Sequence, residues 1–384
     1  RKDGRAGMEA YRRAARGVAS GRLARGMANA TSSAKAAASS TAASSATNAN
    51  RGKELWTVLK QLSKARLSAL VVCSAAAGYV VASGEQVRWQ QLSWTCLGTF
   101  ACAASANTLN QVYEVENDKL MKRTCRRPLP LGKISRRGAL AWAAISGGVG
   151  VLTLYTFTNG TTAALGAANI ALYAGVYTPL KTVSIYNTWV GALVGAVPPL
   201  MGWAAASGSL DPGSAVLAST LHFWQLPHFL ALAYMFRDDY RKGGYQMLTL
   251  VDKTGKRTAA CALRNCVYLL PLGFLAQHLG VATEEFTYQA AALSTALACA
   301  ALVFYFNPSQ PTARVLFAAS LLHLPLYMGS MLVHRVPAEG RLPDGLGGLE
   351  GKMGGGLGRR YSESKVKPYM MPPFPFLPVP VVEA

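Results

Sequence analysis

The feature that most constrains this chain is a series of long apolar segments between residues 66 and 333. A helix that crosses the hydrocarbon core of a bilayer needs about 20 mostly apolar residues. We expect about nine such helices, near residues 66–83, 93–113, 139–158, 162–178, 188–206, 215–236, 264–283, 287–305 and 315–333. Their frequent glycine and alanine residues allow helices to approach closely. The predicted fold class is therefore an all-α, polytopic membrane helical bundle.

Positive charge is concentrated in loops of one parity. The chain has a net charge of +21, and the segments 114–138 and 237–264 hold eight and seven Lys/Arg residues. Lys181 and Arg314 lie in two further loops of the same parity. By the positive-inside rule these loops face the compartment from which the helices were inserted. A nucleic-acid-binding protein is not expected, because no soluble segment is long and apolar enough to carry a basic patch.

The two ends of the chain differ from the apolar middle. Residues 1–53 contain eleven Lys/Arg, only two acidic residues and many Ala and Ser. This composition is typical of a transit peptide and favours a mitochondrion, with a chloroplast or a retained basic tail as the alternatives. We assign residues 54–335 to the transmembrane domain. Residues 336–384 are rich in Gly and then in Pro, and we expect a disordered tail.

An amide and two carboxylates recur at four-residue intervals where the second apolar run ends: Asn110, Glu114 and Asp118. On a helix these positions share one face. Oxygen ligands of this kind suit Mg²⁺, which usually also binds substrate phosphates. The basic segment that follows includes Arg123 and Arg127, whose guanidinium groups are suited to a diphosphate. We therefore predict a metal and diphosphate site at the membrane surface.

A second polar cluster follows the sixth apolar run on the same basic side of the bundle. Asp238 and Asp239 would be further metal ligands, and three basic side chains would bind phosphate oxygens: Arg237, Arg241 and Lys242. Together the two clusters would hold one or two Mg²⁺ ions. The alternative is that these charges only anchor a helix end at the membrane interface.

Four longer strings show a resemblance to a known family. They are Asn110-Gln-x-x-Glu114-x-x-x-Asp118-x-x-Met121-x-Arg123-Thr-x-x-Arg127-Pro-Leu, Tyr177-Thr-Pro-Leu-Lys181, Asn187-Thr-Trp189-Val-Gly191-Ala-x-x-Gly195-Ala-x-Pro198-Pro199-x-Met201-Gly-Trp203 and Trp224-Gln-x-Pro227-His228-Phe. These strings resemble the UbiA superfamily of intramembrane prenyltransferases, in its haem-farnesylating branch. The resemblance spans roughly residues 56–335 and thus all the predicted helices.

The resemblance implies a nine-helix bundle that uses farnesyl diphosphate and haem b to make haem O, with Mg²⁺ as cofactor. Arg123, Arg127, Lys181 and Lys242 would neutralise the departing diphosphate. Asn110, Tyr177, Arg237 and Arg241 would bind substrate. The superfamily usually has two Asp four residues apart in its second motif, but the partner of Asp239 is Met235 here. One Mg²⁺ held mainly by the first motif is therefore equally compatible.

His228 is the histidine best placed to contact haem iron or a propionate. A hydrogen bond between helices is the competing interpretation of this residue. In a mitochondrion, the resemblance implies the inner membrane, basic loops and active site facing the matrix, contact with membrane lipid, and a haem A synthase downstream. Two alternatives are a prenyltransferase acting on a quinone or chlorophyll precursor and a secondary transporter. A transporter would gather its ionisable residues near the membrane midplane instead.

Overall fold

The computed structural model describes residues 52–340 and a few short stretches before residue 30. The predictions of a transit peptide over residues 1–53 and of a disordered tail beyond residue 336 fall almost entirely outside the described residues. They remain predictions.

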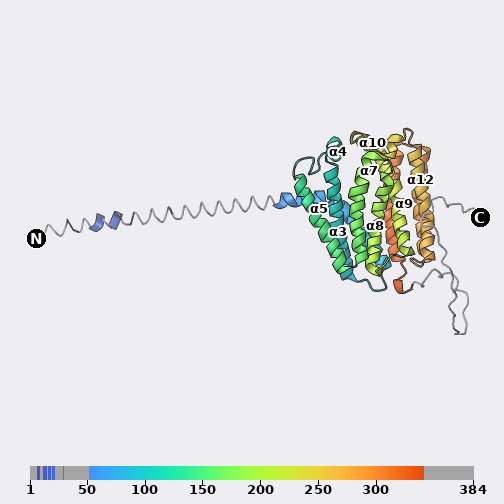
Figure 1. The fold of residues 1–384 in the computed structure, drawn as a ribbon, viewed down its shortest axis with the longest axis horizontal. Coiled ribbons are helices and arrows are strands. Elements are labelled where there is room, and N and C mark those ends of the chain that lie inside the picture. The colour runs from blue at the N-terminus through green and yellow to red at the C-terminus, as the bar shows by residue number, and fades with distance from the viewer. Residues whose placement is uncertain are drawn as a thin grey trace, which may run out of the picture. The chain divides into compact units, whose positions relative to one another are not determined.

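All nine predicted apolar segments form long helices, which run side by side (Figure 1). They are α2 (Ala65–Ala82), α3 (Trp89–Tyr113), α5 (Arg136–Phe157), α6 (Gly160–Ala171) continuing into α7 (Thr178–Val183), α8 (Asn187–Ser207), α9 (Pro212–Met235), α12 (Lys256–His278), α13 (Glu284–Phe306) and α14 (Gln310–Val333). Within residues 52–340 the only β-type pairing is an isolated bridge between Ala282 and Arg335. The all-α prediction is confirmed.

Seven of these nine segments are long and apolar enough to cross a membrane, and α3 and α9 are the exceptions. Both carry polar residues that face the interior of the bundle, such as Asn107 and Gln111 on α3 and Thr220 on α9. Helix α12 begins at Lys256, eight residues before the predicted start of its apolar run at 264. Its first turns carry Lys256, Arg257 and Arg264. Charged residues are tolerated there because long basic side chains can extend from a helix end to the membrane interface.

Close contact between backbones holds the centre of the bundle together. Helix α2 packs along α8, and α8 packs in turn on α9. A Cβ atom on Gly202 would lie 1.8 Å from the carbonyl oxygen of Ala75, and one on Gly78 would lie 2.2 Å from that of Pro199. Only glycine permits this approach between α2 and α8, as in other membrane helix pairs.

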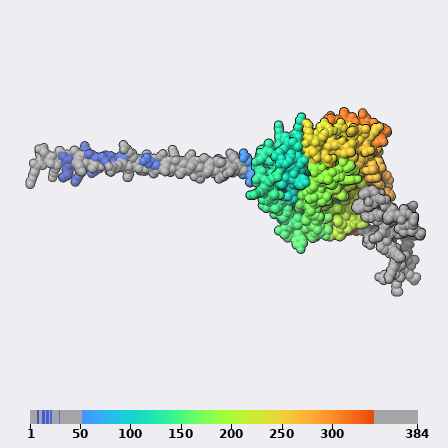
Figure 2. All heavy atoms as spheres, turned by 45° about the horizontal axis from the view of Figure 1, so that its top comes forward, coloured from blue at the N-terminus to red at the C-terminus, as the bar shows by residue number. Residues whose placement is uncertain are grey.

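Short helices gather at one end of the bundle. Helix α4 (Val115–Leu120) follows α3, and α10 (Arg237–Lys242) follows α9. Figure 1 places α4, α7 and α10 at the same end, and Figure 2 turns this end toward the viewer. Asn117 Nδ2 donates to the Gly243 carbonyl at 2.7 Å, and the Gln246 N–H donates to the Lys181 carbonyl at 2.7 Å. Three of the basic loops with the same predicted parity therefore do meet at one end.

The fourth long segment is not a uniform α-helix. A π-helical stretch over Leu172–Tyr177 joins α6 to α7. Such stretches are rare and often occur at functional sites. This one places the Tyr173 and Tyr177 rings 5.3 Å apart, immediately before α7, which Figure 1 shows at the end with the short helices. It brings two aromatic side chains to the lining of the candidate active site.

Candidate active site

The three oxygen donors predicted from the sequence lie together and are buried. Asn110 lies in the last turn of α3, Glu114 joins α3 to α4, and Asp118 lies in α4. Their exposed fractions are 0%, 4% and 1%. Helical geometry runs almost without interruption through Glu114, because the Glu114 N–H donates to the Asn110 carbonyl and the Asp118 N–H donates to that of Glu114. The four-residue spacing therefore places all three on one face, as predicted.

Cations from two other segments pair with these carboxylates. Lys181 Nζ on α7 donates to Glu114 Oε1 at 2.8 Å. Arg127 Nη1 donates to both oxygens of Asp118, at 2.8 and 2.7 Å, and lies 3.8 Å from Glu114 Oε2. Salt bridges of this kind between buried groups leave no carboxylate unpaired.

Lys64 is a third cation of the site, and the sequence reasoning missed it. Its Nζ donates to Asn110 Oδ1 at 2.8 Å. Its backbone is left-handed, with φ 43° and ψ 52°, which is uncommon for a residue other than glycine. Gln111 Nε2 fixes the chain just before it by donating to the Leu62 carbonyl at 2.7 Å. The only signal in the sequence was a lysine immediately before the first apolar run.

The charges of the site influence one another strongly. Burial, together with nearby Arg127 and Lys181, lowers the pKa of Lys64 to about 7. Burial acts to raise the pKa of Glu114, but Lys181 and Lys64 outweigh it and hold that pKa below its ordinary value. Burial raises the pKa of Asp118, and the Arg127 guanidinium opposes this rise. The cationic side chains of the site therefore repel one another, and a bound polyanion would reduce this repulsion.

These groups line a cavity of about 220 Å³, which we call the polar cavity. Arg123 also lines it and donates to the Tyr240 hydroxyl at 3.3 Å. The Lys181 ammonium lies 4.4 Å from the centre of the Tyr177 ring. Of the predicted catalytic and metal residues, the polar cavity therefore brings together Asn110, Glu114, Asp118, Arg123, Arg127 and Lys181.

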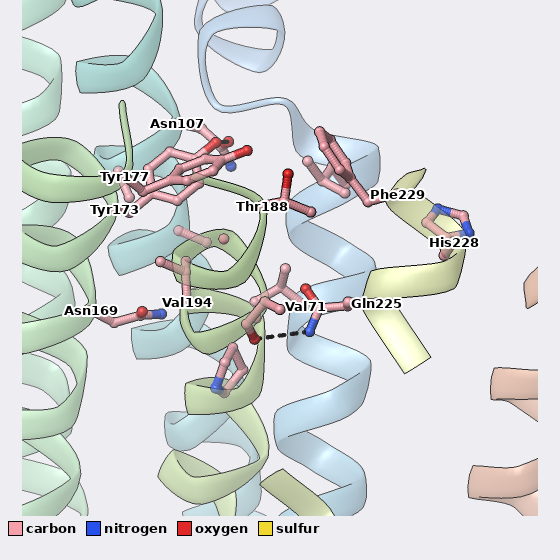
Figure 3. A pocket seen from close by; sticks show the side chains of 17 residues that line it. Val71, Asn107, Asn169, Tyr173, Tyr177, Thr188, Val194, Gln225, His228 and Phe229 are labelled. Carbon is pink, nitrogen blue, oxygen red and sulfur yellow. Dashed lines mark hydrogen bonds between the residues drawn. The ribbon is translucent and has the colours of Figure 1, made fainter. Parts of the chain in front are cut away.

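A second cavity, of about 260 Å³, adjoins the first and lies farther toward the middle of the bundle. We call it the apolar cavity. The two share Leu67, Tyr173, Tyr177 and Phe229 in their linings. Figure 3 shows the two tyrosines at one end of this cavity, with Asn169, Val194 and Gln225 farther along it. The polar cavity therefore adjoins a mostly apolar one at a ring of mostly aromatic side chains.

The residues of the second predicted cluster line neither cavity. Asp239 accepts the backbone N–H groups of Lys122 and Arg123, each at 3.3 Å. Asp238 is exposed and pairs with Arg241 at 3.1 Å. Arg237 lies over the Tyr234 ring at 5.4 Å, and Lys242 is exposed. Asp239 thus holds the segment that carries Arg123, and the other four lie at the surface of the same end.

His228 and Tyr177 both line the apolar cavity. The His228 ring is stacked between Trp224 and Phe317, with centroid distances of 4.9 and 4.7 Å. Its Nδ1 atom lies 2.8 Å from Ser320 Oγ on α14. These contacts tie α9 to α14, as the interhelical alternative for His228 expected.

The donor chemistry fits a magnesium ion that shares its ligands with a substrate. Within the described part of the chain, no three His, Cys, Asp or Glu side chains form a metal cluster. The protein would supply two carboxylates and the Asn110 amide oxygen, so further ligands would come from water and phosphate. Mg²⁺ usually binds in this way rather than in a cage made only of protein groups.

Comparison with known proteins agrees with this geometry. The sequence profile described as the UbiA prenyltransferase family matches residues 70–324. Over 328 residues the chain is 47% identical to the mitochondrial protoheme IX farnesyltransferase of Arabidopsis thaliana, covering 83% of this chain and 76% of that protein. It is 42% identical to the human protein of the same name over 283 residues, covering 74% of this chain and 63% of the human one. The chain thus spans less than two thirds of the human relative.

Solved structures share the fold at low sequence identity. A digeranylgeranylglyceryl phosphate synthase superimposes with a TM-score of 0.64 at 16% identity, covering 73% of this chain and 98% of the other. A UbiA homologue from Archaeoglobus fulgidus, bound to DMAPP and Mg²⁺, has a TM-score of 0.53 at 14% identity and covers 72% and 99%. The chain belongs to the UbiA prenyltransferase family and, within it, to the protoheme IX farnesyltransferases.

Proposed function

We propose that this protein transfers the farnesyl group of farnesyl diphosphate to a vinyl group of protohaem IX, giving haem O. The proposal is supported mainly by the two adjoining cavities, which share four lining residues. The polar cavity is lined by four cationic side chains and two carboxylates, and Tyr173 and Tyr177 line both it and the apolar cavity. One substrate with a charged head and an apolar tail fits both. The acceptor is taken from the four sequence strings and from the relatives' name.

The diphosphate would occupy the polar cavity, where Lys64, Arg127 and Lys181 now bond to Asn110, Asp118 and Glu114 and could turn to one polyanion. Asn110, Glu114 and Asp118 would hold Mg²⁺, which when bound neutralises part of the negative charge on the diphosphate. The Arg127 guanidinium, whose Nη1 atom donates to Asp118, is also suited to phosphate oxygens. Arg123 would complete the set from a segment fixed by Asp239. These preorganised cations stabilise the charge that develops as the carbon–oxygen bond breaks.

The allylic group left after diphosphate departs must meet the vinyl group before it meets water. Under this proposal the carbon lies beside Leu67, Tyr173, Tyr177 and Phe229, which line both cavities. The faces of aromatic rings attract positive charge. The vinyl π electrons form the new carbon–carbon bond, and water then adds to the remaining vinyl carbon and loses a proton.

The relatives are named mitochondrial, and the bundle has several helices that can cross a membrane. We place the protein in the mitochondrial inner membrane with the polar cavity facing the matrix, because its basic loops meet at that end. Under this proposal the product passes to a haem-hydroxylating enzyme such as haem A synthase.

The test is a turnover assay of the purified full chain in lipid nanodiscs with haem b, farnesyl diphosphate and Mg²⁺, read by mass spectrometry. We expect a hydroxyethylfarnesyl haem in the wild type and its loss in Glu114→Gln. Gly148→Ala is the matched control, because a Cβ atom there meets no neighbour within 4 Å. Turnover of farnesyl diphosphate with a quinone precursor, and none with haem, would refute the haem assignment while leaving the family intact.

A further inference from the structure

A small pocket of about 30 Å³ adjoins the far end of the apolar cavity. We call it the terminal pocket. It shares Val71, Ala103, Ala106, Asn169 and Pro198 with the apolar cavity, and Thr99, Cys102, Gly166, Ile170 and Met201 complete its lining. Thr99 lies fifteen residues before Glu114 along the chain, and at 1.5 Å per helical residue this corresponds to about 22 Å. Of the three adjoining cavities, the terminal pocket is thus the one farthest along α3 from the polar cavity.

Two polar atoms at the terminal pocket have no hydrogen-bond partner among the described residues: Thr99 Oγ1 and Asn169 Oδ1. Thr99 is only 2% exposed. Other threonines of α3 satisfy their hydroxyls within the helix: Thr95 donates to the Gln91 carbonyl at 2.8 Å, and Thr108 to the Ala104 carbonyl at 2.7 Å. Thr99 departs from this pattern. Figure 3 shows the Asn169 amide directed into the cavity.

Buried polar groups without a partner in the protein usually bind ordered water. A pocket needs roughly 10–15 Å³ to hold one water molecule, so the terminal pocket has room for about two. We infer that Thr99 and Asn169 bind water in the terminal pocket, and that this hydrated polar end sets the upper limit on the length of the prenyl chain. The inference rests on the proposed function, because it assigns the tail of that substrate to the apolar cavity.

The physical reason is desolvation. A farnesyl tail that stops in the apolar cavity leaves the water and its hydrogen bonds in place. A tail one isoprene unit longer must displace this water and bury a hydroxyl and an amide oxygen against hydrocarbon. Shape alone would give a limit too, since Cys102 and Met201 are buried around the same pocket. The two causes are separable, because valine has nearly the shape of threonine but no hydroxyl.

The experiment measures dissociation constants of the full chain in nanodiscs with Mg²⁺ for farnesyl and geranylgeranyl S-thiolodiphosphate, two analogues that resist ionisation. We expect the wild type to favour the farnesyl analogue. Thr99→Val should shift the ratio of the two constants about tenfold toward the longer chain, because burying an unpaired hydroxyl is no longer required. Asn169→Leu should shift it in the same direction, and Thr99→Ser, which keeps the hydroxyl, should not.

An unchanged ratio in Thr99→Val and Asn169→Leu would overturn the inference and assign the limit to shape. A wild type without preference for the farnesyl analogue would overturn it as well. If Thr99→Val does not fold, the ratio in Asn169→Leu alone tests the inference. This variant should fold, because Asn169 is only partly buried and its Oδ1 atom accepts no hydrogen bond among the described residues. Failure of the wild type to bind either analogue would instead contradict the proposed function, with which the inference would fall.

Discussion

Removing the Arg127 side chain should affect stability and activity in separable ways. Arg127 Nη1 lies 2.7 Å from Asp118 Oδ2, and Asp118 is 1% exposed. At an effective dielectric constant of about 20, this separation corresponds to an attraction of about 6 kcal/mol before desolvation is subtracted. Arg127→Leu leaves a buried carboxylate unpaired, and breaking a buried pair in this way typically costs about 3–5 kcal/mol. We expect the melting temperature to fall by about 10 °C.

The double variant Arg127→Leu/Asp118→Leu separates the two effects. With both charges gone, no unpaired group remains, so most of the lost stability should return. Activity should not return, because both variants lack a cation for the diphosphate and the double variant also lacks a metal ligand. We expect turnover to fall by a factor of about 100 or more in both variants. Thermal unfolding in detergent and the haem product assay measure the two quantities. A double variant as unstable as the single one, or one that regains activity, would refute the reasoning.

Three further perturbations test other parts of the account. Lys64→Met should weaken binding of farnesyl diphosphate by a factor of roughly ten or more, whereas Lys64→Arg should retain most of the affinity. Equal affinities of wild type and Lys64→Met, measured by calorimetry, would show that Lys64 does not bind the substrate. Asp252 is buried, but hydrogen bonds from Thr258 hold its pKa below the ordinary value. Its stabilisation is therefore present above about pH 4 and is lost as pH falls through the lower folded pKa, so the melting temperatures of wild type and Asp252→Asn should converge on acidification. A pH-independent difference would contradict this assignment. Gly202→Ala should lower the melting temperature by several degrees, because the added Cβ atom would collide with the Ala75 carbonyl oxygen. Gly148→Ala, where a Cβ atom meets no neighbour, should leave the melting temperature unchanged. Equal melting temperatures of the two variants would show that the contact between α2 and α8 relaxes easily.

The length and apolar composition of the segments were sufficient to predict the bundle. Each apolar run became a helix, since a chain in a bilayer must satisfy its backbone hydrogen bonds within itself. The boundaries were less accurate where charged residues begin a helix, as at Lys256 in α12. The π-helical stretch at Leu172–Tyr177 had no signal in the sequence, because it depends on how its neighbours pack.

The site was predictable where its residues follow one helix. Asn110, Glu114 and Asp118 meet because a four-residue spacing puts them on one face. Lys64 was not predictable, since it reaches Asn110 across 46 positions in sequence through an unusual backbone conformation. Asp239 was predicted as a metal ligand, but the structure gives it two backbone N–H groups from Lys122 and Arg123 instead of a place in the cavity lining. Spacing along the chain cannot reveal such contacts between helices.

In the proposed function one substrate spans both cavities. A structure of the full chain with farnesyl S-thiolodiphosphate and Mg²⁺ would test this placement. We expect the diphosphate among Lys64, Arg127 and Lys181, with the tail passing Tyr177 toward Asn169. A diphosphate bound at the surface beside Asp238 and Arg241, or a tail that leaves the apolar cavity empty, would contradict it.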